Sequence, residues 1–238
     1  MLKNKRRVTK RSLYGMVANA LGERIVSGQY AQGSVLPPET NIMEEFDISR
    51  TALREAFKVL SAKGLIQSKP KTGTSVNLKK YWNMLDPDIL NWSFDTSSGK
   101  ELLEDLFQIR QAIEPKAAYL AAEKRTPEQL QKIEEAYFRM EEAQYGTDET
   151  FYSDLDFHQA ILDASGNAFM DSFGTMIETA LIRSFNVTTN RGEEYWQASL
   201  PMHKAVYLGI KEGNPERARF EMAALLNVTD EGAKSVLK

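Results

Sequence analysis

Residues 36–78 restrict the possible fold more than any other part of the chain, because four short elements follow one another there. Two prolines precede the first element, and Ser49 is placed to cap the second, which Gly64 ends. The third and fourth elements enclose a basic turn with a glycine at the bend. The expected elements are helices over 40–46 and 50–62 and strands over 65–68 and 74–78. Two short helices joined by a tight turn and followed by a hairpin predict a winged helix-turn-helix.

Helical periodicity dominates the rest of the chain. A first helix is expected over 13–26, and no strand pattern appears after residue 100. Helices are expected there over 102–122, 128–143, 149–164, 169–188, 194–212 and 215–236. The fold class is therefore predicted to be mainly α. A winged helix-turn-helix of three helices and a β-hairpin wing is followed by an all-α helical bundle.

This interpretation divides the chain into four segments. They are a basic tail at 1–11, a winged helix at 12–80, a connector at 81–100 and an all-helical domain at 101–238. The connector is too apolar for a free linker, so part of it is expected to pack on a domain. Its apolar residues are Trp82, Leu85, Ile89, Leu90 and Trp92.

The net charge of −3 conceals a strong asymmetry along the chain. Residues 1–80 contain 15 Lys and Arg against 6 Asp and Glu, whereas the remainder contains 15 against 27. A segment of net charge +9 is thus followed by one of −12, which suggests a polyanionic partner for the first segment only. A solvated basic tail is the alternative, since six of the positive charges lie in the first eleven residues.

The sequence offers no feature of a secreted or membrane-inserted protein. No apolar stretch approaches the roughly 20 residues that cross a bilayer, and no apolar segment with a cleavage site follows the basic start. Without cysteine the chain has no disulfide and no thiolate metal site. A cytoplasmic protein without a membrane partner is the expectation.

The predicted recognition helix begins with the side chains that would read DNA. Arg50, Thr51 and Arg54 follow Ser49 at the end that enters the major groove, where arginine pairs with guanine. In the alternative interpretation, Arg54 is a solvated helix residue and Ser49 is only a cap. The wing should meet phosphate or the minor groove and add affinity more than specificity. Its expected contact residues are Lys69, Lys71, Thr72 and Gly73.

Motifs in both halves of the chain resemble those of a known family. Residues 36–39 (Leu-Pro-Pro-Glu), the run 49–56, 64–66 and Gly73 are similar to the winged helix of GntR-type regulators. The second half resembles the FCD ligand-binding domain of the FadR subfamily. The motifs that carry this second resemblance are 109–115, 121–122, 154–158, 166–167 and His203.

The resemblance implies a DNA-binding transcription regulator and not an enzyme. It further implies a repressor that a small carboxylate effector releases from its operator. Residues 81–92 look like the corresponding segment of sugar-acid regulators, which favours an aldonate or a similar hydroxy acid. Because one winged helix covers too little DNA for useful specificity, a homodimer on a two-fold operator is expected.

A metal site is the next expectation in the helical domain. Asp154 and His158 are four residues apart, so a helix places both on one face, and His203 belongs to a later helix that can face them. A buried His–Asp pair without metal is the commoner arrangement. However, both histidines of the chain fall on ligand positions that the resemblance implies, with zinc, nickel or manganese as candidate ions. The fourth ligand position of metal-binding members is occupied here by Leu225.

Arginine and asparagine side chains are the candidates for binding the effector. Arg110 suits a ligand carboxylate, although an internal salt bridge with Glu114 is an alternative that does not exclude this role. Arg183 and Asn190 are candidates for the effector's hydroxyl groups, or else they end a helix at the surface.

Two other functions remain open, and one residue departs from the family pattern. Three metal ligands also define catalytic zinc sites, so a small metallohydrolase with Asp156 or Glu114 as base is a rival. The helical domain could instead only dimerise, in which case no metabolite would change DNA affinity. Thr40 stands where family members often carry a DNA-contacting arginine, which makes the operator sequence less predictable.

Overall fold

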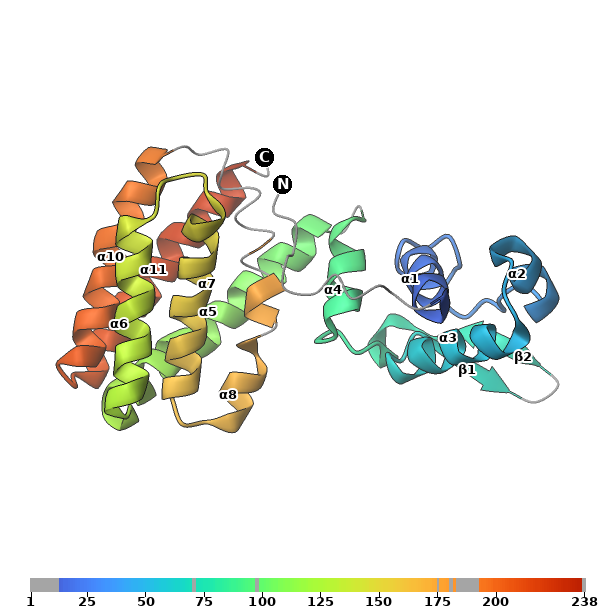
Figure 1. Cartoon of the computed structure of the whole chain (residues 1–238), viewed down its shortest axis with the longest axis horizontal. Coiled ribbons are helices and arrows are strands. Elements are labelled where there is room, and N and C mark those ends of the chain that lie inside the picture. Colours follow the sequence, from blue (N-terminus) through green and yellow to red (C-terminus); the bar gives the residue numbers. More distant parts are fainter. Residues whose placement is uncertain are drawn as a thin grey trace. The chain divides into compact units, whose positions relative to one another are not determined.

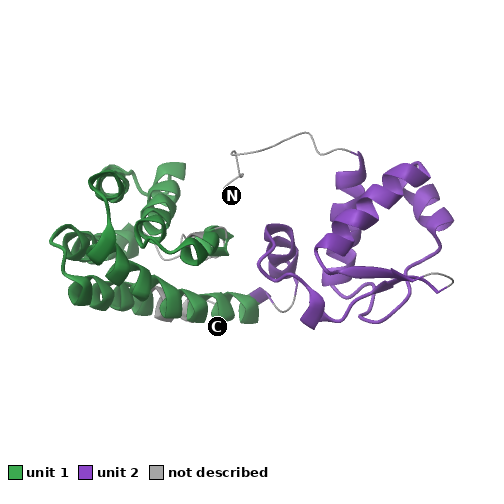
Figure 2. Cartoon of the chain, turned by 90° about the horizontal axis from the view of Figure 1, so that it is seen from below, with its two compact units in different colours: residues 1–2, 100–238 green, residues 3–99 purple. Residues whose placement is uncertain are grey.

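The computed structural model describes residues 13–69, 72–96, 99–174, 176–179, 182 and 193–236. It divides the chain into two compact units, one within residues 3–99 and the other within residues 100–238 (Figure 2). No helix in the described part of the chain is both long enough and apolar enough to cross a membrane.

The first unit is the predicted winged helix-turn-helix (Figure 1). Its elements are α1 (Leu13–Val26), α2 (Glu39–Phe46), α3 (Arg50–Ala62), β1 (Ile66–Lys69) and β2 (Gly73–Val76), followed by a 3-10 helix η1 (Lys79–Tyr81) and α4 (Pro87–Phe94). The two strands are antiparallel, with Ile66 opposite Val76 and Lys69 opposite Gly73. The mainly α fold class with a β-hairpin wing is confirmed.

A single apolar core joins these elements. Leu21 and Ile25 of α1 are buried together with Leu53 and Leu60 of α3, at the four- and seven-residue spacings that put one helix face inward. Gly64 ends the α3 region with a φ of +78°, and a Cβ at this position would overlap the backbone oxygen of Tyr81. This glycine allows the chain after the wing to return against α3.

The connector contains a helix, α4, that the sequence analysis did not predict. Asp86 caps it by accepting hydrogen bonds from the backbone N–H groups of Asp88 and Ile89, and Pro87 occupies its first turn. Trp92 packs against α1 and donates from Nε1 to Asn19 Oδ1 at 3.1 Å. Residues 81–96 therefore fold as part of the first unit.

The second unit is a helical bundle. Its elements are α5 (Gly99–Lys124), α6 (Pro127–Glu142), α7 (Asp148–Ala164), α8 (Ala168–Ser172), α10 (Glu193–Lys211) and α11 (Pro215–Val236). The continuous helix predicted over 169–188 is wrong, because α8 ends at Ser172 and a turn at Phe173 precedes the helical residues 174 and 176–179. Gly174 lies at this break, where a residue of low helix propensity is expected.

Candidate DNA interface and metal centre

The N-terminal end of α3 presents polar side chains to solvent. Ser49 caps the helix by accepting a hydrogen bond from the Ala52 backbone N–H at 3.2 Å. Arg50, Thr51 and Arg54 are exposed, whereas the opposite face of the helix is buried in the core. The structure thus places all three predicted reading residues on one accessible helix end.

The first helix of the helix-turn-helix pair contributes an acidic neighbour. Arg50 Nε lies 3.8 Å from Glu39 Oε2, and the Arg50 side chain keeps 60% of its surface exposed. Thr40, which follows Glu39, is also exposed. Because an exposed pair at this distance is weak, Arg50 is free to exchange Glu39 for a DNA acceptor.

The wing exposes Lys69, Thr72 and Gly73 at its tip. Lys69 is the last residue of β1 and pairs with Gly73, whose φ of +91° is a conformation that favours glycine. The predicted contact residue Lys71 and the basic tail at 1–11 lie outside the described residues.

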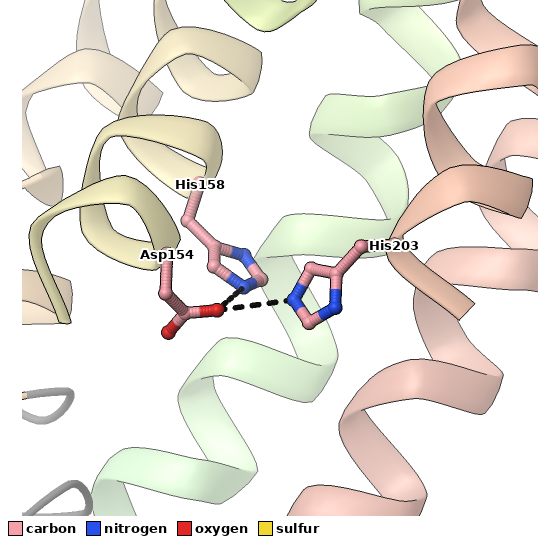
Figure 3. A group of neighbouring side chains, drawn as sticks. All are labelled: Asp154, His158 and His203. Atoms are coloured by element: carbon pink, nitrogen blue, oxygen red, sulfur yellow. Dashed lines mark ion pairs between the residues drawn. The ribbon is translucent and has the colours of Figure 1, made fainter. Parts of the chain in front are cut away.

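Three predicted metal ligands converge inside the helical bundle (Figure 3). Asp154 and His158 come from successive turns of α7, and His203 comes from α10. Asp154 Oδ1 lies 3.0 Å from His203 Nε2 and 3.8 Å from His158 Nε2. Both histidines are buried, and the three ligand atoms lie within 4.8 Å of one another.

The Nδ1 atom of each imidazole lies close to an oxygen acceptor. His158 Nδ1 lies 2.6 Å from Glu114 Oε2, and His203 Nδ1 lies 2.9 Å from the Ser199 carbonyl oxygen. Carboxylate and carbonyl oxygens only accept, so when these rings act as neutral metal ligands the proton is on Nδ1. Both Nε2 atoms then present lone pairs toward the same Asp154 oxygen. This is the arrangement of metal-ligating histidines with a supporting acceptor.

The arrangement fits a divalent cation. His203 Nε2 is buried and makes no aligned hydrogen bond within the described part of the chain. Ligand atoms that share one zinc at about 2.0–2.2 Å lie about 3–4 Å apart, which the two Asp154–His separations match. Leu225 is 2% exposed and has no coordinating atom, so the described residues offer three ligands.

Charges around the triad keep the carboxylates of Asp154 and Glu114 ionised. Burial alone would raise the pKa of Asp154, but its contacts with His203 and His158 and the charge of Arg110 lower it. Burial likewise opposes the charge of Glu114, but the guanidinium of Arg110 and the contact with His158 bring its pKa well below the usual range. Asp154 is therefore available as an anionic ligand.

Arg110 is buried in the same network as Glu114. It is 1% exposed, and its Nε lies 2.5 Å from Glu114 Oε1, which is the internal salt bridge considered above. Its Nη1 is buried and has no hydrogen-bond partner among the described residues. One nitrogen of the guanidinium thus has no acceptor in the part of the chain that the structure describes. The predicted effector residues Arg183 and Asn190 lie outside the described residues.

The two carboxylates considered as catalytic bases have other partners. Asp156 Oδ2 accepts a hydrogen bond from Arg139 at 2.8 Å, on the side of α7 that faces α6. Glu114 is occupied by Arg110 and His158. Neither the contact of Glu114 with His158 nor that of the Ser199 carbonyl with His203 was predicted from the sequence. The only sequence signal that involves Glu114 is its four-residue spacing from Arg110, which indicates a salt bridge between these two residues.

Comparison with known proteins agrees with both halves of this description. Residues 13–76 match the model for bacterial regulatory proteins of the gntR family, and residues 105–228 match the FCD domain. The galactonate operon transcriptional repressor of Escherichia coli K12 is 33% identical over 205 residues, covering 86% of this chain and 89% of that protein.

Two further relatives show the same similarity over nearly the full length. The HTH-type transcriptional regulator LutR of Bacillus subtilis is 31% identical over 217 residues, covering 87% of this chain and 94% of that protein. The solved structure of a Streptococcus agalactiae GntR protein has a TM-score of 0.52 at 26% identity. It covers 92% of this chain and 99% of that chain.

Proposed function

The chain belongs to the GntR family of bacterial regulatory proteins and carries an FCD domain, and from this premise we propose that it is a repressor that a metabolite releases from DNA. The chain is a DNA-binding transcription regulator and not an enzyme. In the proposal, the helical domain binds a divalent metal ion and a small carboxylate. The observation that carries it is the triad of Asp154, His158 and His203, with both Nε2 atoms facing one carboxylate oxygen.

The DNA contacts follow from exposure and charge. Arg50, Thr51 and Arg54 read base edges in the major groove, and Ser49 fixes the helix start that presents them. Lys69, Thr72 and Gly73 follow the sugar-phosphate backbone at the wing, with Lys71 beside them in the sequence.

Asp154, His158 and His203 hold zinc, nickel or manganese, ions that accept mixed nitrogen and oxygen ligands. The ion supplies open coordination positions for a carboxylate and an adjacent hydroxyl. Arg110 Nη1, a buried donor without a partner in the described residues, binds the effector carboxylate. Arg183 and Asn190 remain proposed contacts to hydroxyl groups. The galactonate repressor among the relatives makes a sugar acid the first effector to test.

A second copy of the chain completes the proposed regulator. Phe220 is 69% exposed and Val228 43%, and with Ala224 between them they form one stripe along α11 at four-residue intervals. A large exposed aromatic in an apolar stripe marks an interaction surface. Because two half-sites need two recognition helices, the occupant proposed here is a second protomer. Phe220→Glu should shift sedimentation from dimer to monomer, whereas Phe169→Glu, at an even more exposed position on α8 (82%), should not.

Metal analysis followed by chelation tests the repressor proposal. We expect near-stoichiometric metal in the purified protein and its loss in His158→Ala. Chelation should abolish release from operator DNA by D-galactonate or a related sugar acid while leaving ligand-free DNA binding intact. A protein that binds no metal but still responds to its acid would refute the metal role. DNA affinity indifferent to every hydroxy acid would make the helical domain a dimerisation module only.

A further inference from the structure

A second buried donor in the helical unit has no partner among the described residues. Trp196 is 9% exposed, and its indole Nε1 makes no hydrogen bond to any described residue. Leaving a buried N–H unsatisfied is costly, so such groups are rare unless a bound molecule pairs with them. Arg110 Nη1 is likewise buried and has no hydrogen-bond partner among the described residues.

Trp196 and His203 lie on the same face of α10. They are seven residues apart, which is two turns of helix, and the inward face that they share is buried. Leu200 is also buried on this face, between the two residues. Trp196 is therefore displaced from the metal triad mainly along the bundle axis, by about 10 Å at the backbone.

The direction of this displacement follows from the contacts of α5, α7 and α10. Glu114 of α5 contacts His158 of α7, and both helices run downward along the chain in Figure 1. The two helices are thus parallel.

α10 runs the same way as α5. Arg125 directly follows α5 and donates to the carbonyl oxygen of Lys211, the last residue of α10, at 2.9 Å. The carboxyl ends of both helices therefore meet. Moving from His203 back to Trp196 leads in the same direction as moving from Glu114 back to Arg110.

The two unpartnered donors consequently lie on one side of the triad. We propose that Trp196 Nε1 donates a hydrogen bond to a hydroxyl oxygen of the effector's carbon chain. This inference rests on the proposed function and names the ligand class: a polyhydroxylated acid of about four carbons or more. A carboxylate and one adjacent hydroxyl are already engaged by the metal and Arg110, so the oxygen assigned to Trp196 belongs to a further carbon of the chain.

A hydrogen-bonding site of this kind discriminates through the cost of leaving its donor unpaired. Wild-type protein should therefore bind D-galactonate more tightly than glycolate, which has the same carboxylate and adjacent hydroxyl but no further chain. Trp196→Phe should weaken D-galactonate binding about 3- to 10-fold, as expected for loss of one buried hydrogen bond. Its affinity for glycolate should change less than about twofold.

Calorimetry on the metal-loaded full chain measures both affinities, and fluorescence gives a readout that needs no variant. Trp82 and Trp92 lie in the DNA-binding unit, so Trp196 is the only tryptophan of the helical domain. D-Galactonate should change the tryptophan emission of wild-type protein, and this change should be missing from Trp196→Phe but kept in the control Trp82→Phe. Retained metal in Trp196→Phe shows that the domain is folded.

The outcomes separate this inference from the function on which it rests. If D-galactonate binds Trp196→Phe as tightly as wild type, or if both acids weaken equally, Trp196 does not contact the chain and the inference is wrong while the metal-dependent regulator stands. If wild-type protein binds neither acid with metal present, the hydroxy-acid effector itself is refuted.

Discussion

The packing of α4 on α1 can be tested at a single glycine. Gly22 lies inside α1 and is buried against the Trp92 ring of α4. A Cβ added to Gly22 would lie 2.9 Å from Trp92 Cε3 and closer still to two other atoms of the ring. The ring cannot move away freely, because Trp92 is 7% exposed and its Nε1 is bonded to Asn19.

Two opposing contributions set the expected effect of Gly22→Ala. Alanine in a helix interior stabilises by about 1 kcal/mol relative to glycine. Overpacking against the ring costs about 1–3 kcal/mol, and loss of the Trp92–Asn19 hydrogen bond costs about 1 kcal/mol. The net expectation is a destabilisation of about 1–3 kcal/mol, opposite in sign to the helix propensity.

Urea unfolding followed by tryptophan fluorescence in a Trp196→Phe background reports on the first unit alone, because Trp82 and Trp92 are then the only tryptophans. Gly22→Ala should lower the midpoint. The same substitution beside Trp92→Leu, whose side chain lacks the six-membered ring, should raise the midpoint, with a gain of about 1 kcal/mol in the free energy of unfolding. The difference is a coupling of about 2–4 kcal/mol between the two positions. A higher midpoint for Gly22→Ala with Trp92 present would refute the close packing of α4 on α1.

Three further predictions concern DNA, metal and pH. Arg54→Ala should weaken operator binding by about 1–3 kcal/mol in gel shift or fluorescence anisotropy with an unchanged unfolding midpoint, and unchanged affinity would remove Arg54 from the interface. Leu225→His should slow metal loss to a chelator and weaken the D-galactonate response, since the added imidazole takes an open position; metal loss at the wild-type rate in a folded variant would contradict this. Burial opposes the charge of Lys63, but its bonds with Asp86 and Asp88 raise its pKa above 10.5, so its stabilising effect is complete below that pH and is lost as the pH rises further. Lys63→Met should flatten the alkaline fall in stability of the first unit, and an unaltered pH profile would show that these ion pairs contribute nothing.

The winged helix could be predicted because its signals are local. Ser49, the apolar face of α3 and the basic turn each act within a few residues, so periodicity and capping rules suffice. α4 was missed although its cap, Asp86-Pro87, is equally local. The aromatic residues of this segment predicted packing on a domain, but they showed no helical periodicity. The position of Trp92 depends on a contact with Asn19, which is 73 residues away in the chain.

The helical domain shows the same limit at the level of side chains. Spacing alone puts Asp154 and His158 on one face, but it cannot say which helix brings a third ligand, and only the resemblance selected His203.

The supports of the triad are harder still to predict, because a backbone carbonyl such as that of Ser199 has no sequence signature and Glu114 serves Arg110 and His158 at once. Such groups determine which imidazole nitrogen carries the proton. The sequence therefore identifies the candidate ligands, while the fold decides whether their lone pairs converge on one ion.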